Sequence, residues 1–277
     1  MALLTINHNL MALSAFNNLT RTYGTLAKSV DRLSSGLRIN SAADDAAGLA
    51  IRELMRSDIA VLNQGVRNAN DAISLLQTMD GACQIIDEKL IRMKELAEQA
   101  ATGTYSDLQR QMMHSEFDAM RKEIERIAQA TDFNGMHLLN SSAEIKIHFG
   151  TGSSSAEDYY YITAQNVTSS ALGISDLSLL GQDSAQAALS AIDAAILTKD
   201  AARAHFGGMM NRLQNTVINL TTQAENLQAA ESQISDVDVA HEMTIFVNNQ
   251  IKAQAAVAML AQANSMPQMA LTLLGAA

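Results

Sequence analysis

The longest periodic pattern in this 277-residue chain lies in Met55–Ala100, MRSDIAVLNQGVRNANDAISLLQTMDGACQIIDEKLIRMKELAEQA. Apolar residues recur along it in steps of three and four, which places them in one stripe along a helix. The stripe comprises Met55, Ile59, Leu62, Val66, Ala69, Ile73, Leu76, Met79, Cys83, Ile86, Leu90, Met93, Ala97 and Ala100. A helix on a globular core drifts off such a period within a few turns, whereas a coiled coil keeps it. We therefore expect one very long helix that packs against partner helices.

Three shorter stripes of the same spacing lie on either side. The first comprises Phe16, Leu19, Tyr23, Leu26, Val30, Leu33 and Leu37. The second comprises Met113, Phe117, Met120, Ile124 and Ile127, and the third comprises Phe206, Met210, Leu213, Val217, Leu220, Ala224 and Leu227. Because each stripe needs a partner, the two halves of the chain are predicted to pair, and the two ends to lie together.

The middle of the chain has a different pattern. Ile145, Ile147 and Phe149 alternate with polar residues, and Tyr159–Thr163 is a second β-prone run. Glycines and serines lie between the two runs, which predicts a hairpin, and Asn134-Gly135 is a further turn signal. Helical signal resumes near Asp183-Ser184, a predicted N-cap.

The fold class that we expect is mainly α: a long antiparallel coiled-coil helix bundle with a small β-hairpin region in the middle of the chain. Residues 1–40 plus 236–277 would form a terminal coiled-coil domain. Residues 41–131 plus 186–235 would form a long helical bundle, and 132–185 a β-hairpin and loop region of that same outer domain.

Charge is confined to one part of the chain. All 29 acidic and 19 basic residues lie between Arg21 and Lys252, so both ends are uncharged. The first 20 residues lack the positive start of a secretory signal, and no window is apolar for long enough to span a membrane. A net charge of −10 disfavours a nucleic-acid partner, which would need a basic face. The single cysteine, Cys83, excludes an internal disulfide framework and is expected to be buried.

Signatures of catalysis are scarce, since the chain has no HExxH, GxSxG or GxxxxGK[ST]. The richest titratable cluster is Asp236, Asp238, His241 and Glu242, and the last three share one helical face. That spacing would suit a metal ligand set. The preference of acidic side chains for a helix N-terminus explains it as well. We expect no enzyme, no catalytic residues, no cofactor and no metal.

An interaction protein remains, and the stripes with uncharged ends predict self-assembly. We expect Phe16, Leu19, Leu26, Leu33, Phe246, Val257 and Leu260 to lie in the contacts between copies. Terminal helices with half-covered faces are marginal alone, because helix stability comes mostly from packing. Residues 1–35 and 240–277 are therefore predicted to be poorly ordered in an isolated monomer.

Particular residues resemble those of one family, bacterial flagellin. Leu33–Ile51, LSSGLRINSAADDAAGLAI, is similar to the N-terminal flagellin signature almost letter for letter. Arg67–Asp71 continues the likeness, and Ile234–Asp238 and Leu260–Asn264 extend it near the other end. Only about 50 residues, 132–185, separate the two similar regions, so the chain resembles a short form that lacks large outer variable domains.

This resemblance implies a structural subunit that polymerises into the bacterial flagellar filament for swimming. The terminal helices would form an inner tube and the long helices a surrounding layer. The resemblance also implies export through the flagellar type III apparatus without a cleaved signal peptide. A chaperone would bind the C-terminal segment, and the filament cap and hook-junction proteins would be further partners. The alternative within this architecture is the hook–filament junction protein.

The resemblance implies one further partner, the flagellin-sensing Toll-like receptor of animal hosts. Arg92, Leu96 and Glu116 align with the positions that would contact it. Leu96 lies off the apolar stripe, so we expect it to be exposed. The alternative is that all three residues belong only to the surface or seam of the bundle.

Overall fold

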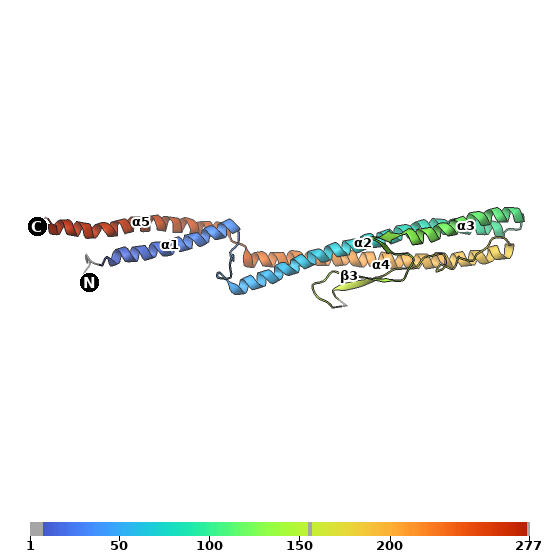
Figure 1. Cartoon of the computed structure of the whole chain (residues 1–277), viewed down its shortest axis with the longest axis horizontal. Helices are drawn as coiled ribbons and strands as arrows, with labels where there is room; N and C mark the ends of the chain where they lie inside the picture. The colour runs from blue at the N-terminus through green and yellow to red at the C-terminus, as the bar shows by residue number, and fades with distance from the viewer. Residues whose placement is uncertain (1–7, 155–156, 276–277) are drawn as a thin grey trace. The chain divides into compact units, whose positions relative to one another are not determined.

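The computed structural model describes residues 8–154 and 157–275, and it divides the chain into two compact units. The terminal unit joins the residues up to Ser57 with those from Asn226 onward, and the central unit is Asp58–Glu225. In the terminal unit, helix α1 (Leu10–Ser35) lies along helix α5 (Val239–Gly275), as Figure 1 shows. The mainly α fold expected from the sequence is confirmed.

Helix α1 is delimited by two residues of opposite kind. The side-chain oxygen of Asn9 accepts a hydrogen bond from the backbone N–H of Ala12 (3.0 Å), which satisfies one of the unpaired donors at the start of the helix. At the other end Gly36 has a φ of 73°, and its N–H donates to the carbonyl of Arg32 (2.8 Å). A left-handed residue of this kind ends a helix and is most easily supplied by glycine.

A short backbone pairing connects the end of α1 to the approach to α5. Leu37 forms an antiparallel bridge with Asp236. Beside it, the N–H of Arg38 donates to Ser235 (2.7 Å) and the N–H of Val237 to Gly36 (3.0 Å). These bonds hold the segment that follows α1 against the segment that precedes α5.

Three long helices build the central unit. Helix α2 (Ala46–Ala101) and helix α4 (Gln182–Ser235) each continue into the terminal unit, while helix α3 (Asp107–Ala130) is wholly central. Figure 1 shows α2, α3 and α4 running alongside one another. Helix α3 begins with a capping box, in which Ser106 and Gln109 each bind the other's backbone N–H.

The apolar stripes predicted from the sequence form the core of the central unit. Members of the core that are fully buried include Leu76, Met79, Ile86, Leu90 and Met93 of α2, Phe117 and Ile124 of α3, and Phe206 and Leu213 of α4. Cys83 is also fully buried, as expected, and burial raises the pKa of its thiol to about 11. Such a thiol is inert at neutral pH.

The buried face of α2 is wider than one stripe. Leu75 and Leu96, both off the stripe, are 3% and 2% exposed. The expectation that Leu96 would be an exposed apolar spot is therefore wrong. A simple two-helix seam buries two positions per heptad, but α2 contacts more than one element and so buries more of its circumference.

Two small hairpins lie between α3 and α4. Strands β1 (Asp132–Phe133) and β2 (Met136–His137) pair through a turn at Asn134 and Gly135, whose φ values of 53° and 78° match the tight hairpin turn expected there. Helix α4 then begins at Gln182, one residue before the predicted N-cap, which is within the usual spread of helix boundaries.

Strands β3 (Glu144–His148) and β4 (Tyr159–Thr163) form the longer, antiparallel hairpin. Ile145 pairs with Ile162 and Ile147 with Tyr160, and these four residues turn inward as the alternation predicts. The ring of Tyr160 lies under the guanidinium of Arg212 on α4 (3.8 Å to the ring centre). The hairpin is thereby attached to α4.

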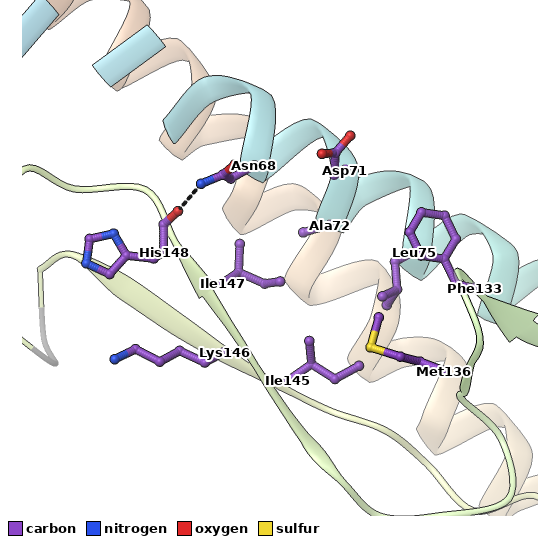
Figure 2. A pocket seen from close by; sticks show the side chains of 10 residues that line it. All are labelled: Asn68, Asp71, Ala72, Leu75, Phe133, Met136, Ile145, Lys146, Ile147 and His148. Carbon is purple, nitrogen blue, oxygen red and sulfur yellow. Dashed lines mark hydrogen bonds between the residues drawn. The ribbon is translucent and has the colours of Figure 1, made fainter. Parts of the chain in front are cut away.

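The same hairpin is attached to α2 by a close backbone approach. A Cβ atom added to Gly65 would come within 2.1 Å of the carbonyl oxygen of Phe149, so only glycine fits there. One turn further along, the side-chain amide of Asn68 donates to the carbonyl of His148 (2.8 Å), as Figure 2 shows. Beyond this bond lies a hollow of about 340 Å³, lined chiefly by apolar side chains such as Leu75, Ile145 and Ile147.

Candidate assembly surface

The seam between α1 and α5 uses only part of the N-terminal apolar stripe. Leu19, Leu26 and Leu33 are half-buried, and on α5 so are Phe246 and Leu260. Two small residues of α5, Ala253 and Ala263, are 5% and 8% exposed, because α1 and α5 pack closely there. The amide of Asn9 also donates to the carbonyl of Ala263 (2.7 Å).

A buried carboxylate lies in this seam. Glu242 of α5 is 5% exposed; one of its oxygens accepts a hydrogen bond from the hydroxyl of Ser29 (2.5 Å), and the other lies 3.6 Å from the guanidinium of Arg32. Buried charges are tolerated when they are paired and hydrogen-bonded in this way. Glu242 therefore fixes how α5 lies against α1.

The other members of the stripe on α1 are open. Phe16, Tyr23 and Val30 are exposed by 54%, 51% and 47%, and they recur one heptad apart. Leu10, Met11 and Leu13 extend this apolar surface toward the start of the helix. Helix α5 thus covers one row of the stripe and leaves the other row in solvent.

Helix α5 has an open apolar row as well. Val239, Met243, Val247 and Ile251 follow one another at four-residue steps and are 44–58% exposed, and Val257 is 48% exposed. Beyond Lys252 this helix has no charged residue. Exposed apolar surface of this extent marks an interaction site rather than an ordinary solvent-facing surface.

Two of the three residues that the resemblance suggested as receptor contacts come together on the central unit. Nε of Arg92 on α2 lies 2.8 Å from Oε1 of Glu116 on α3, and both side chains are more than 40% exposed. The bonds from Glu116 and then Glu95 raise the pKa of Arg92. Leu96 lies beneath this surface in the core.

The acidic cluster near the start of α5 does not converge on one point. Asp238 accepts hydrogen bonds from the N–H groups of Ala240 (3.0 Å) and His241 (3.1 Å), which is the role of a helix cap. Glu242 turns toward Ser29 instead. Across residues 8–154 and 157–275, no three His, Cys, Asp or Glu side chains gather as metal ligands would. No helix within the same ranges is long and apolar enough to cross a membrane.

A network of charges between α2 and α4 was not anticipated from the sequence. Lys199 is 1% exposed and pairs with Asp87 and with Asp200, and Arg203 pairs with Asp80 (2.7 Å). The signal that could have found it is the spacing of Lys199 and Phe206, which are one heptad apart, so that a lysine falls on the apolar stripe.

The chain is thus a bundle of long paired helices, and its terminal pair leaves apolar rows uncovered. These features define a class of protein: helical subunits that pack against further protein. Comparison with known sequences narrows this class to one family. Residues 6–144 match the bacterial flagellin N-terminal helical region, and residues 189–274 match the bacterial flagellin C-terminal helical region.

Relatives match over nearly their whole length. A flagellin from Halalkalibacterium halodurans is 42% identical, with 97% of this chain and 99% of the relative covered. The same coverage holds for a flagellar filament 33 kDa core protein from Treponema phagedenis, which is 40% identical. The crystal structure of Bacillus cereus flagellin superposes with a TM-score of 0.50 at 34% identity, covering 60% of this chain and 94% of that one. The chain belongs to the bacterial flagellin family.

A hook-associated protein is similar in fold only. The structure of one from Vibrio parahaemolyticus has a TM-score of 0.59 and covers 70% of this chain and 100% of that one, but it is 16% identical. Flagellins therefore match far better in sequence than this hook-associated protein does.

Proposed function

We propose that this chain is the structural subunit that polymerises into the flagellar filament, and that the open rows of α1 and α5 are the contacts between copies. The observation that supports this most is the row Phe16, Tyr23 and Val30, which α5 leaves about half exposed. Burying apolar surface drives association, and neighbouring copies carry the same uncovered rows. Uncharged helix ends suit such packing, because no unpaired charge has to be desolvated.

The test is polymerisation of purified full-length protein, followed by electron microscopy and light scattering with filament seeds. Phe16→Asp is expected to abolish growth while the central unit stays helical, because it puts a charge into the buried contact. Asn18→Asp adds the same charge at an exposed polar position two residues away, and it should still polymerise. Leu260→Asp tests the half-buried seam and is expected to block growth too. Intact chain that forms no filaments even with seeds would overturn the proposal.

Membership of the family supports further parts of this function. The filament lies outside the cell, so the chain would act there after export. The long apolar surface of α5 is what a chaperone at the C-terminal segment would cover before assembly. The cap and the hook-junction proteins would contact subunits at the two ends of the filament.

A second function is favoured by the exposed ion pair of Arg92 with Glu116, which aligns with the receptor contacts of such flagellins. The receptor would bind at this paired surface, while Leu96 would act only by supporting α2 from within. A reporter assay should show a loss of signalling for Arg92→Ala. Arg126→Ala is the matched control, because that arginine is exposed and paired with Glu123 on α3. Equal signalling by both variants would end this proposal.

A further inference from the structure

Small buried residues recur at heptad spacing along α4, which is paired with α2. Ala188, Ala195 and Ala202 are one heptad apart and only 0%, 1% and 4% exposed. On a neighbouring row, Ile192, Lys199 and Phe206 follow one another at heptad spacing, and all three are buried. Three identical small residues pack equally well after a shift of seven residues. Apolar contact along this alanine row therefore selects the register of α4 against α2 only weakly.

Charged residues cross the same seam at heptad spacing. Asp80, Asp87 and Lys94 of α2 are seven residues apart. They pair in turn with Arg203 (2.7 Å), with Lys199, and with Asp193 (2.6 Å) of α4. The order of charge is thus two acids and a base on α2, opposite two bases and an acid on α4.

We propose that this charge pattern sets the register of α2 against α4, by rejecting the neighbouring heptad registers that the apolar seam tolerates. The lysine at the centre carries the argument. Lys199 lies between Ile192 and Phe206 on the stripe and is 1% exposed, so it occupies a place where an apolar residue would fit. A buried ion pair stabilises a fold little better than apolar residues of the same size, and its best attested use is to specify register.

Sliding α4 by one heptad in one direction brings like charges together. Asp87 would meet Asp193, and Asp80 would lie between Lys199 and Asp200. Arg203 and Lys94 would each lose their carboxylate on the other helix. Like charges placed together in a partly buried seam repel, so this register is rejected.

Sliding in the opposite direction is rejected by the buried lysine. Lys94 would meet Lys199, whose side chain is 1% exposed, so the two cations would meet in a largely buried place. Asp80 would face Met210 and Leu213 and lose its cation, whereas Asp87 would keep one, because Arg203 would come to lie opposite it. Lys94 would also reach Asp200, so this direction carries the smaller penalty and is the one into which a weakened seam slides first.

Distance measurement between spin labels tests the proposal in the full-length chain. Labels at Asn70→Cys and Ala201→Cys, in a Cys83→Ala background, sit on exposed positions offset along the axis. A slide of one heptad moves one label past the other by about 10 Å. With the wild-type charge pattern, the two labels should show a single distance, because only one register is populated. Asp87→Leu with Lys199→Met replaces the buried pair by apolar residues and should add a second distance, with unchanged or higher thermal stability.

A second variant guards against loss of folding. Lys94→Glu with Asp193→Lys changes two half-exposed residues and keeps every native pair attractive. In the shifted registers, residue 193 would then be a cation opposite Asp87, and residue 94 an anion opposite Lys199. Neither register is rejected by like charges any longer, so a second label-to-label distance is again expected. Arg92→Met with Glu116→Leu removes an ion pair between α2 and α3 and should keep one distance. One unchanged distance in the Lys94→Glu, Asp193→Lys variant would overturn the proposal.

Discussion

Gly65 and Gly81 lie on the same helix, and their surroundings predict opposite effects of one added methyl group. At Gly65 a Cβ would meet the carbonyl of Phe149, whereas at Gly81 no atom lies within 4 Å. Gly65→Ala is expected to push β3 away from α2 and to cost about 2 kcal/mol of unfolding free energy, as overpacking of a close contact does. Gly81→Ala should stabilise by up to about 1 kcal/mol, because alanine favours a helix over glycine.

Thermal unfolding followed by circular dichroism measures both substitutions. The displacement of the hairpin is checked at the side-chain amide of Asn68. Its hydrogen bond to the carbonyl of His148 should weaken in Gly65→Ala and stay unchanged in Gly81→Ala. If Gly65→Ala left the melting temperature and that bond unchanged, the hairpin would not be packed on α2 as closely as described.

Single residues also show where sequence reasoning succeeds and fails. Heptad counting identified Phe117 and Ile124 as core, because apolar spacing reports directly which face of a helix is buried. It misplaced Leu96, because the width of a buried face depends on how many neighbours a helix has, and spacing alone does not report that number. It passed over Lys199, since a count of apolar residues treats a buried lysine as an interruption.

At the scale of elements, the helices and the turn at Asn134-Gly135 could be predicted, since each has a local cause in spacing, caps or backbone freedom. The two-residue strands β1 and β2 on either side of that turn could not, because so short a pairing has no periodicity of its own. For the candidate assembly surface, the spacing of apolar residues predicts the stripe from Phe16 to Leu37. Which row of it α5 covers depends on side chains 200 or more residues away in sequence, such as Glu242.

The pair of α1 and α5 should be the least protected part of the isolated subunit. Its seam is half-buried at Leu19, Leu26 and Leu33, whereas α2 buries every residue of its stripe from Leu76 to Met93. Local opening costs least where few apolar contacts are made, so amides in α1 and α5 are expected to exchange much faster than those of α2 between Leu76 and Met93. Hydrogen exchange with mass spectrometry on dilute monomer measures the difference.

The same measurement on filaments supplies the comparison. Assembly buries the open rows, so protection of α1 and α5 should rise toward that of α2. Strong protection of both helices already in dilute monomer would mean that their own seam suffices, and that assembly is not needed to order them.

At the scale of the whole molecule, every copy has a formal net charge of −10 at pH 7 and a pI near 5.0. Copies that associate through uncharged apolar rows must therefore approach against their own repulsion. Salt screens charges beyond about 8 Å at physiological ionic strength. Seeded growth is expected to speed up as sodium chloride rises from roughly 10 to 150 mM, and again as the pH falls from 7 toward the pI and the net negative charge becomes smaller in magnitude.

Light scattering with a fixed amount of seed gives the growth rate. Asn18→Asp, with one more negative charge, should grow more slowly than wild type at low salt and approach it at high salt. Phe16→Asp should stay unassembled across the range, because screening does not remove the cost of burying its carboxylate. A growth rate that fell with added salt would instead show that attractive ion pairs between copies, and not their apolar rows, dominate the approach.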